Sequence, residues 1–206
     1  MTSIIQWLLA VPGHSIVPLF EMESGMIVKT RLLGQNKRRV LARSPLMEAT
    51  VIELIESGLK QESWTGMLYV MGVGNNEQFS PLYVGKAERR GRKNDLSANI
   101  ANIRKNTHKF ARWGDSLDYH IGDMSYELFG ASVYRNPYKK YKKWVETIFE
   151  SKEPPTLKQP VFLYVAPWTE RSTGPSGLLG SLPAAEKEVV ALACGSFPGL
   201  LNVDGI

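Results

Sequence analysis

A chain of 206 residues with 43% hydrophobic and 22% charged residues is too apolar for an intrinsically disordered protein and long enough for one well-cored domain with elaborations. Its net charge of +5 is compatible with a polyanionic partner, although many basic proteins bind no nucleic acid. The single cysteine, Cys194, excludes an internal disulfide and favours a reducing, cytoplasmic location. The apolar run at residues 4–11 is shorter than the ~20 residues that span a bilayer, and no basic residue precedes it. We therefore expect neither a membrane segment nor a signal peptide.

Residues 1–62 are expected to form an N-terminal arm. A short helix within residues 1–12 is ended by Pro12, and turn residues separate strands predicted at 16–20, 26–33 and 38–42. Ser44 is a suitable N-cap with Pro45 at the first helical position, ahead of an amphipathic helix. A basic cluster in this arm allows two interpretations, a solvated face or a surface that contacts the DNA backbone. It comprises Lys29, Arg31, Lys37, Arg38, Arg39 and Arg43.

Two short apolar runs, at residues 67–71 and 82–84, each carry a tyrosine and are predicted to be strands. The polar, Gly- and Asn-rich residues 73–81 between them are typical of a hairpin loop. A basic turn follows, and a helix is predicted to begin at Asn94 or Asp95. Helical spacing places residues 96, 100, 103, 107 and 110 on one stripe and stacks Arg104 and His108 at its rim.

In this order, Met67-Leu68-Tyr69, Tyr83-Val84-Gly85 and Arg104-x-x-x-His108 resemble the motifs of the GIY-YIG nuclease superfamily, with Met67 in place of the first glycine. Lys86, directly after the second triplet, is similar to the subset that includes some type II restriction enzymes. The resemblance implies a glutamate on a later helix, followed by an asparagine.

Downstream, a strand is predicted at residues 119–121 and a lysine-rich amphipathic helix at 134–151, whose basic side is either solvated or in contact with phosphate. A Pro-rich connector at 152–160, a buried strand at 161–165 and a long Gly/Ser/Pro loop at 169–183 follow. A last helix then runs from Pro183 to Gly195. Its apolar face includes Glu186, which requires a partner because burying an unpaired carboxylate is costly.

Glu186 and Asn202 extend the resemblance to the C-terminal part of the chain, with Glu188 as an alternative glutamate. The resemblance implies one divalent metal, Mg²⁺ or Mn²⁺, on Glu186, with Asn202 supporting the site from behind. Arg104 would contact the scissile phosphate, while Tyr83 and His108 would orient the water and the phosphate or assist proton transfer.

Tyr69 would act as general base or position the water, and Lys86 would lie close enough to lower its pKa. His14 and His120 have no supporting partners in the sequence and are interpreted as structural. Several further basic residues are predicted to contact nucleic acid, namely Arg89, Arg90, Arg92, Lys93, Lys139 and Lys140.

The expected fold is α+β, with a small mixed or antiparallel three-stranded sheet flanked by helices. The arm at 1–62 would precede a nuclease-like domain at 63–206 into which the basic helix 134–151 is inserted. The predicted function is a metal-dependent DNA endonuclease, of restriction or defence type, in which cutting both strands needs a homodimer or two visits. The alternatives are a non-catalytic DNA-binding module, favoured by Met67, and a nuclease acting on RNA or branched intermediates.

Overall fold

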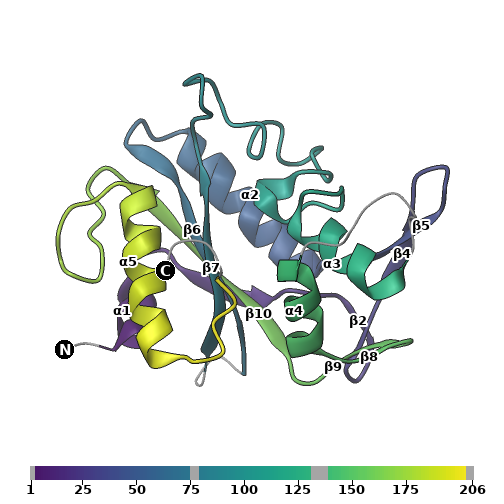
Figure 1. Ribbon diagram of the computed structural model, residues 1–206. Coiled ribbons are helices and arrows are strands. Elements are labelled where there is room, and N and C mark those ends of the chain that lie inside the picture. Colours follow the sequence, from purple (N-terminus) through teal and green to yellow (C-terminus); the bar gives the residue numbers. More distant parts are fainter. Residues whose placement is uncertain (1–2, 75–78, 131–138, 203–206) are drawn as a thin grey trace.

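A computed structural model describes residues 3–74, 79–130 and 139–202 of the chain. Within these residues the central sheet is antiparallel and has four strands rather than the three expected, in the order β1-β10-β6-β7 (Figure 1). These strands are β1 (Ser15–Pro18), β6 (Trp64–Val73), β7 (Ser80–Glu88) and β10 (Val161–Thr169). The α+β class is confirmed, and so are the predicted strands at 67–71, 82–84 and 161–165, which lie inside β6, β7 and β10.

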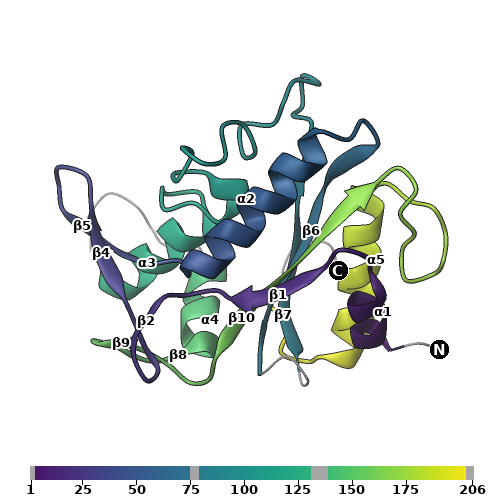
Figure 2. The same cartoon turned by 180° about the vertical axis from the view of Figure 1, so that it is seen from behind.

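Helices cover both faces of this sheet, as Figures 1 and 2 show from opposite sides. Side chains alternate between the faces of a strand, so Met67, Tyr69 and Met71 belong to one hydrophobic cluster and Leu68 and Val70 to another. The first cluster lies under α2 (Pro45–Leu59), α3 (His120–Phe129) and α4 (Lys139–Ile148). The second lies under α1 (Ile4–Ala10) and α5 (Leu182–Ser196).

The N-terminal residues contribute to more than one sheet. Beyond β1, they form a second sheet with a later segment in the order β2-β3-β9-β8, and a separate β4–β5 hairpin. The strands concerned are β2 (Met22–Ser24), β3 (Ile27–Val28), β4 (Thr30–Leu33), β5 (Arg38–Leu41), β8 (Phe149–Lys152) and β9 (Pro155–Leu157). The helix predicted after Ser44 is confirmed, with Ser44 as N-cap and Pro45 in the first turn.

The helix predicted to carry Arg104 and His108 is wrong. Residues 91–109 form successive turns, and the chain then enters a single 3₁₀ turn, η1 (Phe110–Arg112). Asn102 has a positive φ of 53°, which interrupts any helix. The Asn106 amide donates to the carbonyls of Ala98 (2.8 Å) and Ala101 (3.0 Å). The Asn106 side chain therefore binds backbone carbonyls that would accept from backbone N–H groups in a helix.

Two other predicted boundaries also differ. The strand predicted at 119–121 is wrong, because Tyr119 is the N-cap of α3 and His120 its first residue. The predicted helix 134–151 is confirmed over α4; its residues 134–138 lie outside the described residues, and its last three belong to β8. No helix in the described part of the chain is long and apolar enough to cross a membrane.

Candidate active site

The tyrosines of the two triplets lie on the same face of the β6–β7 hairpin. Tyr69 is opposite Gly85 in the register and Tyr83 is opposite Met71, and the two tyrosine rings are 6.4 Å apart. Lys86 is opposite Leu68 and therefore projects from the other face, toward α5. There its Nζ lies 2.6 Å from Oε2 of Glu186. The predicted residues are thus divided between the two faces of the hairpin.

Tyr69 begins a buried chain of hydrogen bonds. Its hydroxyl lies 2.9 Å from Nε2 of His120, and Nδ1 of His120 lies 2.9 Å from the hydroxyl of Tyr141. Burial, with a smaller contribution from Tyr83, raises the pKa of Tyr69 well above 10.0. Tyr69 is therefore a neutral phenol at pH 7. The expectation that Lys86 lowers this pKa is wrong, because Lys86 pairs with Glu186 on the opposite face.

His120 is also neutral. Burial lowers its pKa well below 6.5, and the charges of Lys140 and Arg112 lower it further. A neutral imidazole donates from one nitrogen and accepts at the other, so the chain of hydrogen bonds from Tyr69 to Tyr141 has a single direction. The rings of Trp113 and Trp144 lie 4.7 and 5.1 Å from the imidazole and form apolar walls around it.

Two cations border this chain. Lys140 donates to the hydroxyl of Tyr83 at 3.1 Å, and its Nζ lies 4.2 Å from the centre of the same ring. The Arg112 guanidinium lies 5.3 Å from the ring centre of Tyr119, and its charge acts on the pKa of both Tyr69 and His120. Tyrosine, histidine and lysine side chains therefore meet on one face of the hairpin, and the charge of Arg112 acts on Tyr69 and His120.

The sequence does not single out Arg112, and it indicates no partners for His120; the buried imidazole agrees with a structural interpretation, but Tyr69 and Tyr141 are its partners. A usable signal was present, because His120, Ile121, Met124 and Leu128 have helical spacing. That spacing would have placed His120 on the buried face of a helix, where an imidazole needs partners.

Arg104 and His108 are not part of this cluster. Arg104 is exposed and makes two hydrogen bonds to the Glu56 carboxylate on α2, of 2.5 and 2.6 Å. His108 Nδ1 lies 3.0 Å from Oδ1 of Asp115, a fully buried carboxylate. Both positions follow from the turns that replace the expected helix.

The α5 side of the hairpin carries the carboxylates. Glu88 Oε2 lies 3.9 Å from the Lys86 Nζ that also binds Glu186, and Glu186 contributes to the raised pKa of Tyr69. No group of three or more potential metal ligands occurs in the described ranges. One or two carboxylates still fit Mg²⁺ or Mn²⁺, because Mg²⁺ keeps several waters and shares substrate phosphates. The alternative, Glu188, instead accepts a hydrogen bond from the backbone N–H of Ser176 in the preceding loop.

Asn202 closes the outer edge of β7. Its Oδ1 accepts from the N–H of Val84 at 2.9 Å, and its Nδ2 donates to the carbonyl of Val84 at 2.8 Å. The Asn202 amide thus makes the two backbone hydrogen bonds that a neighbouring strand would make with Val84, next to Tyr83. This contact fixes the strand that carries the second triplet, as a supporting residue would.

Many of the basic residues are held by contacts within the chain. Arg89 donates to the carbonyls of Gln61, Glu62 and Trp64, and Arg90 to that of Asn94. Arg92, Lys93 and Lys139 are exposed. In the N-terminal cluster, Lys37 is exposed and the other five side chains bind polar groups of the protein, namely Lys29, Arg31, Arg38, Arg39 and Arg43.

Comparison of the chain with family models, with curated proteins and with solved structures gives no match.

Proposed function

We propose that this chain is a metal-assisted DNA endonuclease whose active site is centred on the Tyr69–His120–Tyr141 chain of hydrogen bonds. One observation carries the proposal: three tyrosines, a neutral histidine and Lys140 meet on one face of the β6–β7 hairpin, and the charge of Arg112 acts on two of them. Phosphodiester hydrolysis requires an oriented water and cations that offset charge on the phosphorane-like transition state.

Arg112 and Lys140 are suited to that charge. An arginine presents fixed, permanently charged donors to phosphate oxygens. Arg112 borders the Tyr69–His120 pair, whereas Arg104 is engaged by Glu56. We therefore transfer the expected phosphate-binding role from Arg104 to Arg112.

Tyr69 and His120 are suited to orienting the water. If the Tyr69 hydroxyl donates to Nε2 of His120, its oxygen keeps lone pairs that can accept from an attacking water once DNA binding opens the site, because Tyr69 is 2% exposed in this structure. A neutral phenol in this position orients the nucleophile, and the proton of the water would pass to solvent; this loss is favoured when the pKa of the water is lowered by a metal held by Glu186. Tyr141, which contacts the other ring nitrogen, keeps the imidazole in the required tautomer.

Glu186 would hold the metal, which supplies Lewis-acid chemistry at the phosphate when bound. Lys86 lies against its Oε2 and adds a positive charge on the same side. Glu186 and Tyr69 lie on opposite faces of the β6–β7 hairpin, so the substrate would have to contact both faces.

A non-catalytic DNA-binding module is the second candidate. The division of the predicted residues between the two faces of the hairpin and the pairing of Arg104 with Glu56 favour it. Such a protein would bind DNA with an affinity that falls as salt rises and would release no product.

The test is nicking and linearisation of supercoiled plasmid with Mg²⁺, with EDTA as the control. We expect the wild type and Arg104→Ala to cut, Arg112→Ala to bind DNA and cut it about 100- to 1000-fold more slowly, and Glu186→Gln to bind but not cut. The two arginine variants are matched, since each removes one cation from the same stretch of turns. Uncut plasmid, phage and genomic DNA together with salt-sensitive binding would establish the binding module instead. A panel of single-stranded, branched and RNA oligonucleotides identifies the substrate class.

A further inference from the structure

The turn that carries Arg112 has an unusual backbone. Phe110, Ala111 and Arg112 have φ values of 29°, 49° and 80°, so three consecutive residues with side chains lie in the region that favours glycine. Such a conformation is unfavourable for residues with side chains and persists only when its surroundings impose it. The contacts around this turn must therefore hold it in place.

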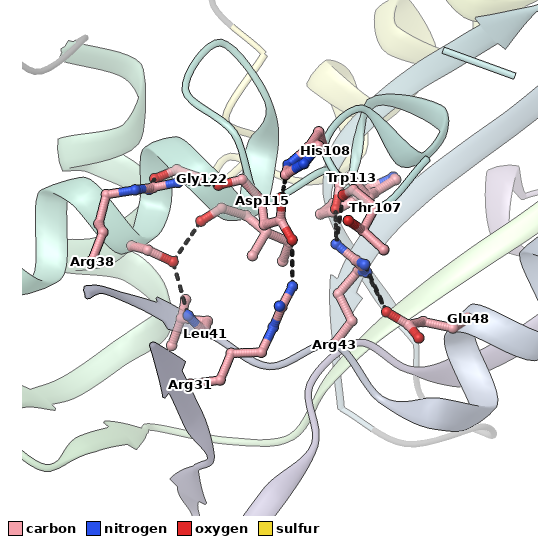
Figure 3. Close-up of polar contacts among 12 residues, drawn as sticks. Arg31, Arg38, Leu41, Arg43, Glu48, Thr107, His108, Trp113, Asp115 and Gly122 are labelled. Carbon is pink, nitrogen blue, oxygen red and sulfur yellow. Dashed lines mark hydrogen bonds and ion pairs between the residues drawn. The ribbon is translucent and has the colours of Figure 1, made fainter. Parts of the chain in front are cut away.

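Arg43 supplies contacts to both ends of the turn. Its Nη1 donates to the carbonyl of Trp113 at 3.1 Å and to that of Thr107 at 3.4 Å, as Figure 3 shows. The guanidinium carbon lies 4.5 Å from the ring centre of Phe110. The opposite side of the guanidinium binds Glu48, with Nε–Oε1 at 2.8 Å. The Arg43 side chain is only 1% exposed, so these contacts are made away from water.

Asp115 fixes the chain just after the turn. Its buried carboxylate binds Arg31 and His108, and its backbone carbonyl accepts from Arg38. Figure 3 shows these side chains approaching Asp115 from different elements. Arg31, Arg38 and Arg43 lie in the first part of the chain, and all three bind the segment between β7 and α3.

We infer that Arg43 is a positioning residue for Arg112. Its Nη1 donates to the carbonyls on either side of the strained turn while Nε and Nη2 are held by Glu48, and so the guanidinium sets where the Arg112 side chain lies relative to Tyr69 and His120. This inference rests on the proposed function for its catalytic consequence, but the grip on the turn can be measured without any activity. A misplacement of about 1 Å at a reacting group can lower a rate about 100-fold.

The experiment compares Arg43→Lys with a matched control, Arg39→Lys. Arg39 also packs its guanidinium 4.5 Å from a phenylalanine ring and pairs with a glutamate, but its partners are Phe129 and Glu153. Arg43→Lys keeps the charge and loses the fork. Glu48→Gln, at a partly exposed position, weakens the ion pair with Arg43 and leaves the buried arginine in place. This variant replaces Arg43→Lys in the experiment if Arg43→Lys does not fold.

Two readouts are needed. Trypsin cleavage after Arg112 in the native protein reports the grip on the turn, and we expect it to accelerate at least tenfold in Arg43→Lys and not in Arg39→Lys. Single-turnover DNA cleavage reports the catalytic consequence. We expect it to slow about 100-fold in Arg43→Lys with unchanged DNA affinity, and the Arg43→Lys/Arg112→Ala double variant to be no slower than Arg112→Ala alone.

The outcomes separate the two proposals. Unchanged proteolysis at Arg112, or effects of the two substitutions that multiply in the double variant, would overturn the positioning role of Arg43. Faster proteolysis in Arg43→Lys with no cleavage of any DNA by the wild type would support the grip on the turn and refute the endonuclease.

Discussion

Gly85→Ala tests whether the second triplet requires a glycine because of Tyr69. A Cβ on Gly85 would lie 2.6 Å from three atoms of the Tyr69 side chain, including the hydroxyl oxygen. The ring cannot move aside freely, because Tyr69 is 2% exposed and its ring centre lies 5.4 Å from that of Trp113 and 5.9 Å from that of His120.

The expected loss of stability has two parts. Overpacking a close-fitting core costs about 1–3 kcal/mol, and separating the Tyr69 hydroxyl from His120 leaves buried polar groups unpaired at about 1–3 kcal/mol. A loss of about 3 kcal/mol in a domain of this length lowers the Tm by about 6–12 °C.

The assay is thermal and urea unfolding of Gly85→Ala beside Gly91→Ala. A Cβ on Gly91 would lie 3.7 Å from the carbonyl of Asp95, an ordinary contact, so this control should unfold like the wild type. If Gly85→Ala also unfolds within about 1 °C of the wild type, then the packing of Tyr69 against this backbone does not require a glycine at position 85.

Three further predictions follow from the same structure. Burial holds the pKa of His120 well below 6.5 in the folded protein, so only the unfolded chain binds a proton at this residue as the pH falls from 6.5 to 5. The free energy of unfolding should therefore drop by up to about 1.4 kcal/mol per pH unit. Urea titrations at several pH values should show a weaker dependence of this free energy on pH in His120→Gln. Asn202→Ala removes both hydrogen bonds to Val84 and should lower the free energy of unfolding by about 2 kcal/mol in urea titrations, whereas an unchanged midpoint would mean that β7 does not need this partner. EDTA should stop DNA cleavage and leave the Tm within about 1 °C, since Lys86 pairs with Glu186 without a metal; a large shift in a calorimetric scan would contradict this.

Local patterns predicted much of the fold. The apolar runs around Tyr69 and Tyr83 indicated the hairpin, and Ser44 followed by Pro45 indicated the start of α2. These signals are properties of a few adjacent residues, and the structure keeps them because alternation and capping agree with the tertiary packing.

The errors have a common physical origin in the segment between β7 and α3. Apolar spacing around Ile100 and Ile103 favoured a helix, but Asn102 and Asn106 satisfy the backbone with turns and side-chain hydrogen bonds. Arg43 then holds the next turn from a distant part of the chain. No local pattern encodes that contact, so the sequence could not predict that Arg112, rather than Arg104, would border Tyr69.

The order of strands in the central sheet constrains how the chain can fold while it is being synthesised on the ribosome. β1 is made first and occupies one edge, yet its partner is β10, with Ser15 opposite Val165. The β6–β7 hairpin can form as soon as it emerges, whereas β1 and the inner edge of β6 must wait for most of the chain. Nascent chains arrested before residue 161 should therefore present unpaired strand edges to chaperones, and release from those chaperones should coincide with the emergence of β10.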